Sequence, residues 1–136
     1  MKICITSLGP NLNSPIDPRF GRSRYFLILD EDGNLKESLP NSGMGAMRGA
    51  GIAAAQEMAN RGTEILITGN IGPNAFSVLS QIGIKVFLVS PGISVKEAFS
   101  LWKENKLSQV QTPTVPGHFG FGRGRGRGGR GFRGPR

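Results

Sequence analysis

The stretch from residue 65 to residue 89 constrains the fold most, because its pattern predicts a strand, a glycine-rich turn at residues 69–74, a helix and a second strand. The helix is expected to bury one stripe at i, i+3, i+4 and i+7 spacing, made of Ala75, Phe76, Val78, Leu79 and Ile82. Both strands are too uniformly apolar to have a solvent-exposed face, which predicts parallel strands covered on both sides. In such sheets ligands bind where turns follow the carboxyl ends of strands, so residues 69–74 are the first candidate site.

The remaining segments complete a small α/β domain. Strands are predicted over residues 2–6, 24–30 and 35–39, and helices over residues 50–60 and from residue 95 to about residue 105. The first strand is expected to be central with Cys4 buried, because both of its faces are apolar. The strand over residues 35–39 is polar enough for the edge of the sheet, next to the hairpin turn that precedes it.

Length and composition favour one folded domain over residues 1–116, followed by a tail over residues 117–136. The chain has 136 residues, enough for one domain with a substantial core. Cys4 is the only cysteine, so we expect neither a disulfide framework nor a cysteine cluster that ligates zinc or iron-sulfur centres. The start of the chain resembles neither a signal peptide nor a membrane span. A cytoplasmic protein without a membrane partner is the simplest expectation.

Positive charge is concentrated in the tail. The formal net charge is +8, and six basic residues belong to the tail: Arg123, Arg125, Arg127, Arg130, Arg133 and Arg136. The rest of the chain has 11 basic and 9 acidic residues, so the net charge of the folded part is close to zero. Glycine-arginine repeats cannot bury a core and are expected to remain disordered. Such a tail suits RNA or another polyanion, and a solubilising tail without a specific partner is the alternative.

Several catalytic and nucleotide-binding motifs are excluded. Residues 43–49 resemble a dinucleotide fingerprint, but the last glycine falls one position late and the segment follows an edge strand. Residues 69–74 lack the Gly-Lys-Ser/Thr ending of a P-loop. The only histidine, His118, lies in the tail, so no Ser-His-Asp or Cys-His set can be assembled. We therefore assign no catalytic residue and no protein ligand to a metal.

Three loops are expected to meet at one end of the sheet. They cover residues 8–23, 69–74 and 90–94, and the glycine-rich entrance to the helix at residues 50–60 should approach the same end. The loop over residues 8–23 is much longer than the usual 4–6 residues or so, and loops of that length tend to be functional or disordered. Phe20 favours a loop anchored to the core. Helix N-termini and four arginines then favour an anion: Arg19, Arg22, Arg24 and Arg48.

Four motifs occur in order over residues 1 to about 110. They are Asp17-Pro18-Arg19-Phe20-Gly21-Arg22 followed by Tyr25-Phe26, then Gly49-Ala50-Gly51-Ile52-Ala53-Ala54-Ala55-Gln56, then Gly69-x-x-Gly72-Pro73-Asn74-Ala75-Phe76, and then Gly83-Ile84-Lys85-Val86. Together they resemble the dinitrogenase iron-molybdenum cofactor biosynthesis family, whose domain is nitrogenase accessory factor-like. The resemblance implies a three-layer ribonuclease H-like α/β fold. Its five-stranded mixed sheet would have the order 3-2-1-4-5, with strand 2 antiparallel and helices on both faces.

The resemblance also implies a non-enzymatic function. It is the binding or carrying of an anionic metal-sulfur cluster or its precursor, of the iron-molybdenum-cofactor or thiomolybdate type, containing Mo, Fe or Cu and bound non-covalently. A metal-cluster donor or acceptor protein is the implied partner. Cofactor-carrying members typically have His-Phe-Gly in the first long loop, whereas this chain has Arg19 in place of the histidine, which excludes imidazole ligation there.

The expected cofactor-binding residues lie on the converging loops. They are Arg19, Phe20, Gly21, Arg22, Arg24, Arg48, Gly49, Gly69, Asn70, Gly72 and Asn74. Two other functions stay open. One is a nucleic-acid-associated protein that acts through the tail arginines, and the other is an enzyme acting on a small phosphorylated compound, for which no catalytic base can be identified.

Overall fold

The computed structural model describes residues 1–41 and 50–111. The strands are β1 (Lys2–Ser7), β2 (Tyr25–Asp30), β3 (Leu35–Pro40), β4 (Thr63–Thr68) and β5 (Lys85–Leu88), and the helices are α1 (Ala50–Asn60), α2 (Pro73–Gln81) and α3 (Val95–Lys103). They form one sheet in the order β3-β2-β1-β4-β5. β2 is antiparallel to β1 and β3, whereas β1, β4 and β5 are parallel. The predicted α/β class, strand order and antiparallel second strand are confirmed.

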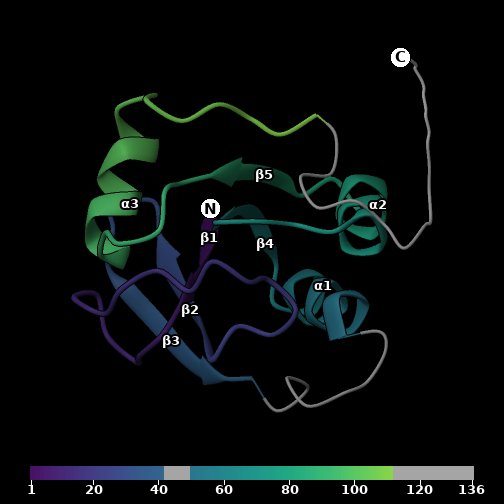
Figure 1. The fold of residues 1–136 in the computed structure, drawn as a ribbon, viewed down its shortest axis with the longest axis horizontal. Coiled ribbons are helices and arrows are strands. Elements are labelled where there is room, and N and C mark those ends of the chain that lie inside the picture. The colour runs from purple at the N-terminus through teal and green to yellow at the C-terminus, as the bar shows by residue number, and fades with distance from the viewer. Residues whose placement is uncertain (42–49, 112–136) are drawn as a thin grey trace.

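The helices cover both faces of the sheet, with α1 and α2 on one face and α3 on the other (Figure 1). Cys4 points toward the first pair of helices and shares a core with Met58 and Leu79. Ile5 points the other way and shares a second core with Phe99. Because side chains alternate between the faces of a strand, a strand covered on both faces buries successive residues, as β1 does from Ile3 to Ser7.

One part of the predicted α2 stripe is wrong. Ala75 and Leu79 are buried, whereas Ile82 is 45% exposed. α2 ends at Gln81, and Gly83 with φ 85° then turns the chain, so Ile84 joins the core at this end.

Beyond α3 the chain returns along β5. The N–H of Val110 donates to the carbonyl oxygen of Val86 at 2.7 Å, and Gln109 forms an antiparallel bridge with Phe87. The folded part therefore extends at least to residue 111. The predicted boundary at residue 116 and the tail lie outside the described residues. Within residues 1–41 and 50–111, no helix has both the length and the apolar character that a membrane crossing needs.

Leu79→Ala is expected to lower the free energy of unfolding by about 2–5 kcal/mol, because it removes a fully buried side chain and leaves a cavity. Ile82→Ala is the matched control three residues beyond, and its exposed side chain predicts a loss below about 1 kcal/mol. Urea unfolding measures both losses. Equal losses would contradict the burial of Leu79 and the exposure of Ile82.

Candidate functional site

The three loops predicted to converge do meet at the carboxyl ends of the parallel strands. Isolated bridges join Pro15 to Ser94 and Arg19 to Asn70. The N–H of Ile16 also donates to the carbonyl oxygen of Ile93 at 2.9 Å. The loop over residues 8–23 is therefore attached to the loops that follow β4 and β5.

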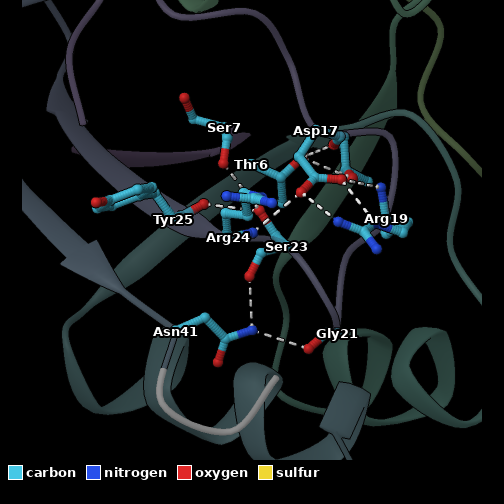
Figure 2. Close-up of polar contacts among 10 residues, drawn as sticks. Thr6, Ser7, Asp17, Arg19, Gly21, Ser23, Arg24, Tyr25 and Asn41 are labelled. Atoms are coloured by element: carbon cyan, nitrogen blue, oxygen red, sulfur yellow. Dashed lines mark hydrogen bonds and ion pairs between the residues drawn. The ribbon is translucent and has the colours of Figure 1, made fainter. Parts of the chain in front are cut away.

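A buried carboxylate organises the arginine-bearing half of the first loop. Asp17 is fully buried, and Figure 2 shows its carboxylate directed at Arg19 and the backbone of Arg24. Its Oδ1 accepts from the backbone N–H and the Nε–H of Arg19, each at 3.1 Å. Its Oδ2 accepts from Nη2 of Arg19 at 3.1 Å and from the backbone N–H of Arg24 at 3.0 Å. Both oxygens thus fix residues 17–24 in one bend, which we call the arginine bend.

The backbone of Asp17 is bound to the central strands. Its N–H donates to the carbonyl oxygen of Thr6 at 3.1 Å, and its own carbonyl oxygen accepts from the Thr6 hydroxyl at 2.6 Å. Oγ1 of Thr6 also lies 2.9 Å from Oγ1 of Thr68, and both threonines are fully buried. The arginine bend is therefore attached where β1 and β4 end side by side.

The Asp17 carboxyl is held in its ionised form. Burial alone would raise its pKa, but the hydrogen bonds from the guanidinium and backbone of Arg19 and from the backbone of Arg24 lower it, as does the charge of Arg19. The pKa of Asp17 therefore lies below its usual value. A charged carboxylate at this position keeps the guanidinium of Arg19 in place at neutral pH.

Arg19 reaches from this buried ion pair to solvent. Its side chain is 54% exposed, whereas that of Asp17 is fully buried. The loop after β4 approaches the bend closely, because a Cβ on Gly69 would lie 2.6 Å from the Cα of Pro18. Three predicted site residues, Arg19, Gly69 and Asn70, are therefore neighbours.

α2 begins directly after these residues. Its N-cap, Gly72, supplies no side-chain cap, and Pro73 occupies an early helical position. The first N–H groups of a helix have no partner within the helix. α1 begins close by, because a Cβ on Gly51 would lie 2.9 Å from the Cβ of Ala75. Two helix N-termini with positive dipole ends thus lie at the end of the sheet that carries Arg19, an arrangement that favours an anion.

Phe20 and Gly21, also predicted as site residues, have structural partners. Phe20 is only 3% exposed, and its ring centroid lies 5.9 Å from that of Phe26, so it anchors the bend in the core. The carbonyl oxygens of Gly21 and Ser23 each accept from the side-chain amide of Asn41 at 2.9 Å (Figure 2). Asn41 therefore braces the bend from the end of β3.

The other predicted residues divide into two groups. The side chains of Arg22, Arg24 and Asn74 are exposed, the first two on the arginine bend and the third in the first turn of α2. Arg48, Gly49 and the six tail arginines lie outside the described residues, so the nucleic-acid hypothesis stays a prediction. In the part of the chain that the structure describes, no three His, Cys, Asp or Glu side chains are grouped as metal ligands.

Sequence reasoning did not identify the residues that support the site, namely Asp17, Thr6, Thr68 and Asn41. The sequence carries one signal for Asp17, an acidic residue two positions before an arginine inside a long loop. Thr6 and Thr68 follow apolar strand residues, a place where a polar side chain needs a partner if it is buried.

Asp17→Asn is expected to lower the free energy of unfolding by about 2–4 kcal/mol at pH 7, because the new amide group places a donor among the N–H donors of Arg19 and Arg24. In the wild type, the folded-state pKa of Asp17 is lower than the unfolded-state value of 3.8. Its contribution is therefore complete above that unfolded-state value and is lost as the pH falls through the folded-state pKa.

The difference between Asp17→Asn and the wild type should consequently shrink below about pH 4, as measured by urea unfolding at a series of pH values. Asp32→Asn, which changes an exposed carboxylate in the β2–β3 turn, serves as the control and should cost less than about 0.5 kcal/mol. A difference for Asp17→Asn that stays constant down to acidic pH would show that the ionised carboxylate is not what stabilises the bend.

Comparisons with known proteins identify the family of this chain. A family model described as dinitrogenase iron-molybdenum cofactor matches residues 1–105. An uncharacterized protein of Methanocaldococcus jannaschii is 36% identical over 114 residues, which cover 82% of this chain and 92% of that protein.

Two solved structures resemble this one over nearly their whole length. The apo form of the orange protein from Desulfovibrio gigas matches with a TM-score of 0.80 and 34% identity, over 84% of this chain and 96% of that chain. The NMR structure of a Thermotoga protein of the DUF35 family, described as a candidate NifB protein, matches with a TM-score of 0.73 and 34% identity, over 84% and 97% of the two chains. The fold is thus that of the orange protein, while the ribonuclease H-like comparison stays a prediction. Since the family model matches most of its length, the chain belongs to the dinitrogenase iron-molybdenum cofactor family.

Proposed function

We propose that this protein binds and carries an anionic metal-sulfur cluster, or the precursor of one, at the carboxyl end of its parallel strands. The observation that supports this most is the position of Arg19, whose exposed guanidinium is fixed by Asp17 beside Asn70 and the uncapped start of α2. Membership of a family described by the iron-molybdenum cofactor supports the class of cargo.

The chemistry of these groups suits a cargo that is held without a protein-metal bond. A guanidinium stays protonated and has no lone pair for a metal, so Arg19 binds through charge and hydrogen bonds. The N–H groups at the start of α2 add dipoles of fixed direction. Arg22 and Arg24 add positive charge on the same bend. A compact polyanion of the thiomolybdate or iron-molybdenum-cofactor type would engage these groups together.

The proposed role is transfer of the cargo, without catalytic turnover. Cys4, whose thiol could ligate a metal, is fully buried in the core beneath α1 and α2, and burial raises its pKa so that the thiol stays protonated. Arg19 and the first turn of α2, in contrast, lie at the surface. The expected partner is a cytoplasmic protein that donates the cluster or accepts it.

Under anaerobic conditions, the full chain is expected to bind tetrathiomolybdate saturably, as followed by the visible absorption of the anion. Arg19→Ala should weaken the affinity by about 10-fold or more, because charge-assisted hydrogen bonds are lost. Arg19→Lys keeps the charge but not the planar fork of donors, so its affinity should lie between those of Arg19→Ala and the wild type.

Lys85→Ala is the matched control, because it removes one exposed positive charge from the opposite end of the sheet, where β5 begins. It should leave the affinity within about twofold of the wild type. Absence of saturable binding would contradict the proposed function. Equal affinities of Arg19→Ala and Lys85→Ala would contradict the assigned site.

Gly69→Ala is expected to weaken tetrathiomolybdate binding by about 10-fold, because the added Cβ pushes the Pro18 backbone away and separates Arg19 from Asn70. Gly83→Ala is the control for lost stability. Its positive φ should cost about 1–2 kcal/mol on unfolding, but it lies at the far end of α2 and should not change the affinity. Binding titrations measure the affinity of each variant, and urea unfolding measures its stability. Similar affinities for Gly69→Ala and Gly83→Ala would contradict the prediction that the close approach of the loops matters for binding.

A further inference from the structure

Two buried threonines lie side by side where β1 and β4 end. Thr6 and Thr68 are both fully buried, and their Oγ1 atoms lie 2.9 Å apart. Each follows a core residue by two positions, Cys4 in β1 and Leu66 in β4, so both lie on the face of the sheet that α1 and α2 cover. A buried hydroxyl costs free energy unless it is hydrogen-bonded, so the partners of these two groups matter.

The hydroxyl proton of Thr6 can be assigned to one bond. A threonine hydroxyl donates one proton and accepts through two lone pairs, whereas a carbonyl oxygen can only accept. Because Oγ1 of Thr6 lies 2.6 Å from the carbonyl oxygen of Asp17, its proton belongs to that bond (Figure 2). The contact between the two hydroxyls then requires Thr68 to donate to Thr6. The two hydroxyls thus form a donor chain that runs from β4 to the arginine bend, and bonds in such a chain strengthen one another.

Thr6 binds both backbone groups of Asp17. Its carbonyl oxygen accepts from the N–H of Asp17 at 3.1 Å, and its hydroxyl donates to the carbonyl oxygen of the same residue. The carboxylate of Asp17 in turn accepts from Nε and Nη2 of Arg19. The exposed guanidinium is therefore connected to the buried end of β1 through a single residue.

Thr68 belongs to the segment that leads into α2. Its carbonyl oxygen accepts from the N–H of Val89 at 3.0 Å, which fixes it to the end of β5. The next residue, Gly69, lies against the backbone of Pro18. α2 begins five residues after Thr68, at Pro73. The hydroxyl pair therefore joins the arginine bend to the segment that carries the start of α2.

We propose that Thr6 and Thr68 are positioning residues of the site, and that their hydroxyls set the spacing between the guanidinium of Arg19 and the first N–H groups of α2. Both threonines are fully buried, so they act through Asp17 and do not touch the cargo. The proposal rests on the proposed function, because this spacing matters only to an anion that contacts both halves of the site. Such an anion loses affinity when the halves move apart, even in a folded protein.

Removing the hydroxyl of Thr6 from the full chain tests the proposal. Thr6→Val nearly keeps the shape of the side chain, and the affinity for tetrathiomolybdate should fall by about 5–10-fold. Thr6→Ser keeps the hydroxyl and should stay within about threefold of the wild type. Thr68→Val leaves both bonds between Thr6 and Asp17 in place, so it should weaken binding by only about two- to fourfold.

Thr63→Val is the matched control. Thr63 is also buried, at 5% exposure, but it lies at the other end of β4, where its hydroxyl contacts Sδ of Met58 at 4.0 Å. Losing this hydroxyl should leave the affinity within about twofold of the wild type. Urea unfolding verifies that every variant is folded at the temperature of the titration. Equal affinities of Thr6→Val and Thr63→Val would overturn the proposal.

Hydrogen exchange at Nε of Arg19 is a second measurement, and it needs no cargo. Proton and nitrogen NMR of the full chain at mildly acidic pH follows this N–H, whose signal is identified by its loss in Arg19→Lys. Thr6→Val should speed its exchange by about fivefold or more, because the accepting carboxylate of Asp17 is no longer held in place, whereas Thr63→Val should not.

The two measurements separate this proposal from the proposed function. An unchanged exchange rate in Thr6→Val would overturn the proposal, and so would faster exchange with unchanged affinity. Failure of the wild type to bind tetrathiomolybdate would contradict the proposed function. The exchange rates would then still decide whether the threonines fix Arg19.

Discussion

The loop end of this protein depends on one buried carboxylate. Asp17 is fully buried, and an unpaired charge in such a place costs several kcal/mol. Four donors offset that cost, two from the Arg19 side chain and two from the backbone of Arg19 and Arg24. These donors converge only when residues 17–24 adopt one bend. The charge of Asp17 therefore favours a single conformation of residues 17–24, which form no helix. This irregular loop forms one fixed side of the site.

The mixed sheet determines where this wall lies. β2 is antiparallel to β1, so the chain leaves β1 at Ser7 and enters β2 at Tyr25 at the same end of the sheet. Residues 8–23 need not cross a face of the sheet, and their length is available to shape a site. On the other side of β1 the parallel neighbour β4 ends at Thr68, next to Thr6. The arginine bend is bound at this junction, which places Arg19 beside the start of α2.

Hydrophobic periodicity predicts the helices and strands of the described residues to within a few positions, because each is a local pattern. Ile82 marks its limit, since the pattern assigns it to the buried stripe, whereas it caps the end of α2 and is exposed. The strand order depended on family resemblance, because pairing joins residues far apart in the chain. The structural role of Asp17 could not be predicted for the same reason, because its backbone is hydrogen-bonded to Thr6, which is distant in the chain. A loop has no period, so the sequence places Arg19 near a cleft without showing that the carboxylate two residues earlier is buried and accepts from Arg19 and Arg24.

A carrier must release its cargo as well as bind it, and the surroundings of Arg19 suit both steps under the proposed function. Asp17 occupies Nε and Nη2, so the guanidinium meets its cargo with a partly compensated charge. The side chain is 54% exposed, and an ion pair in such a high-dielectric position contributes little by itself. Affinity must then come from several contacts acting together, with the N–H groups of α2 among them. A partner protein that displaces one loop removes a share of these contacts and can take the cargo without breaking a metal-protein bond.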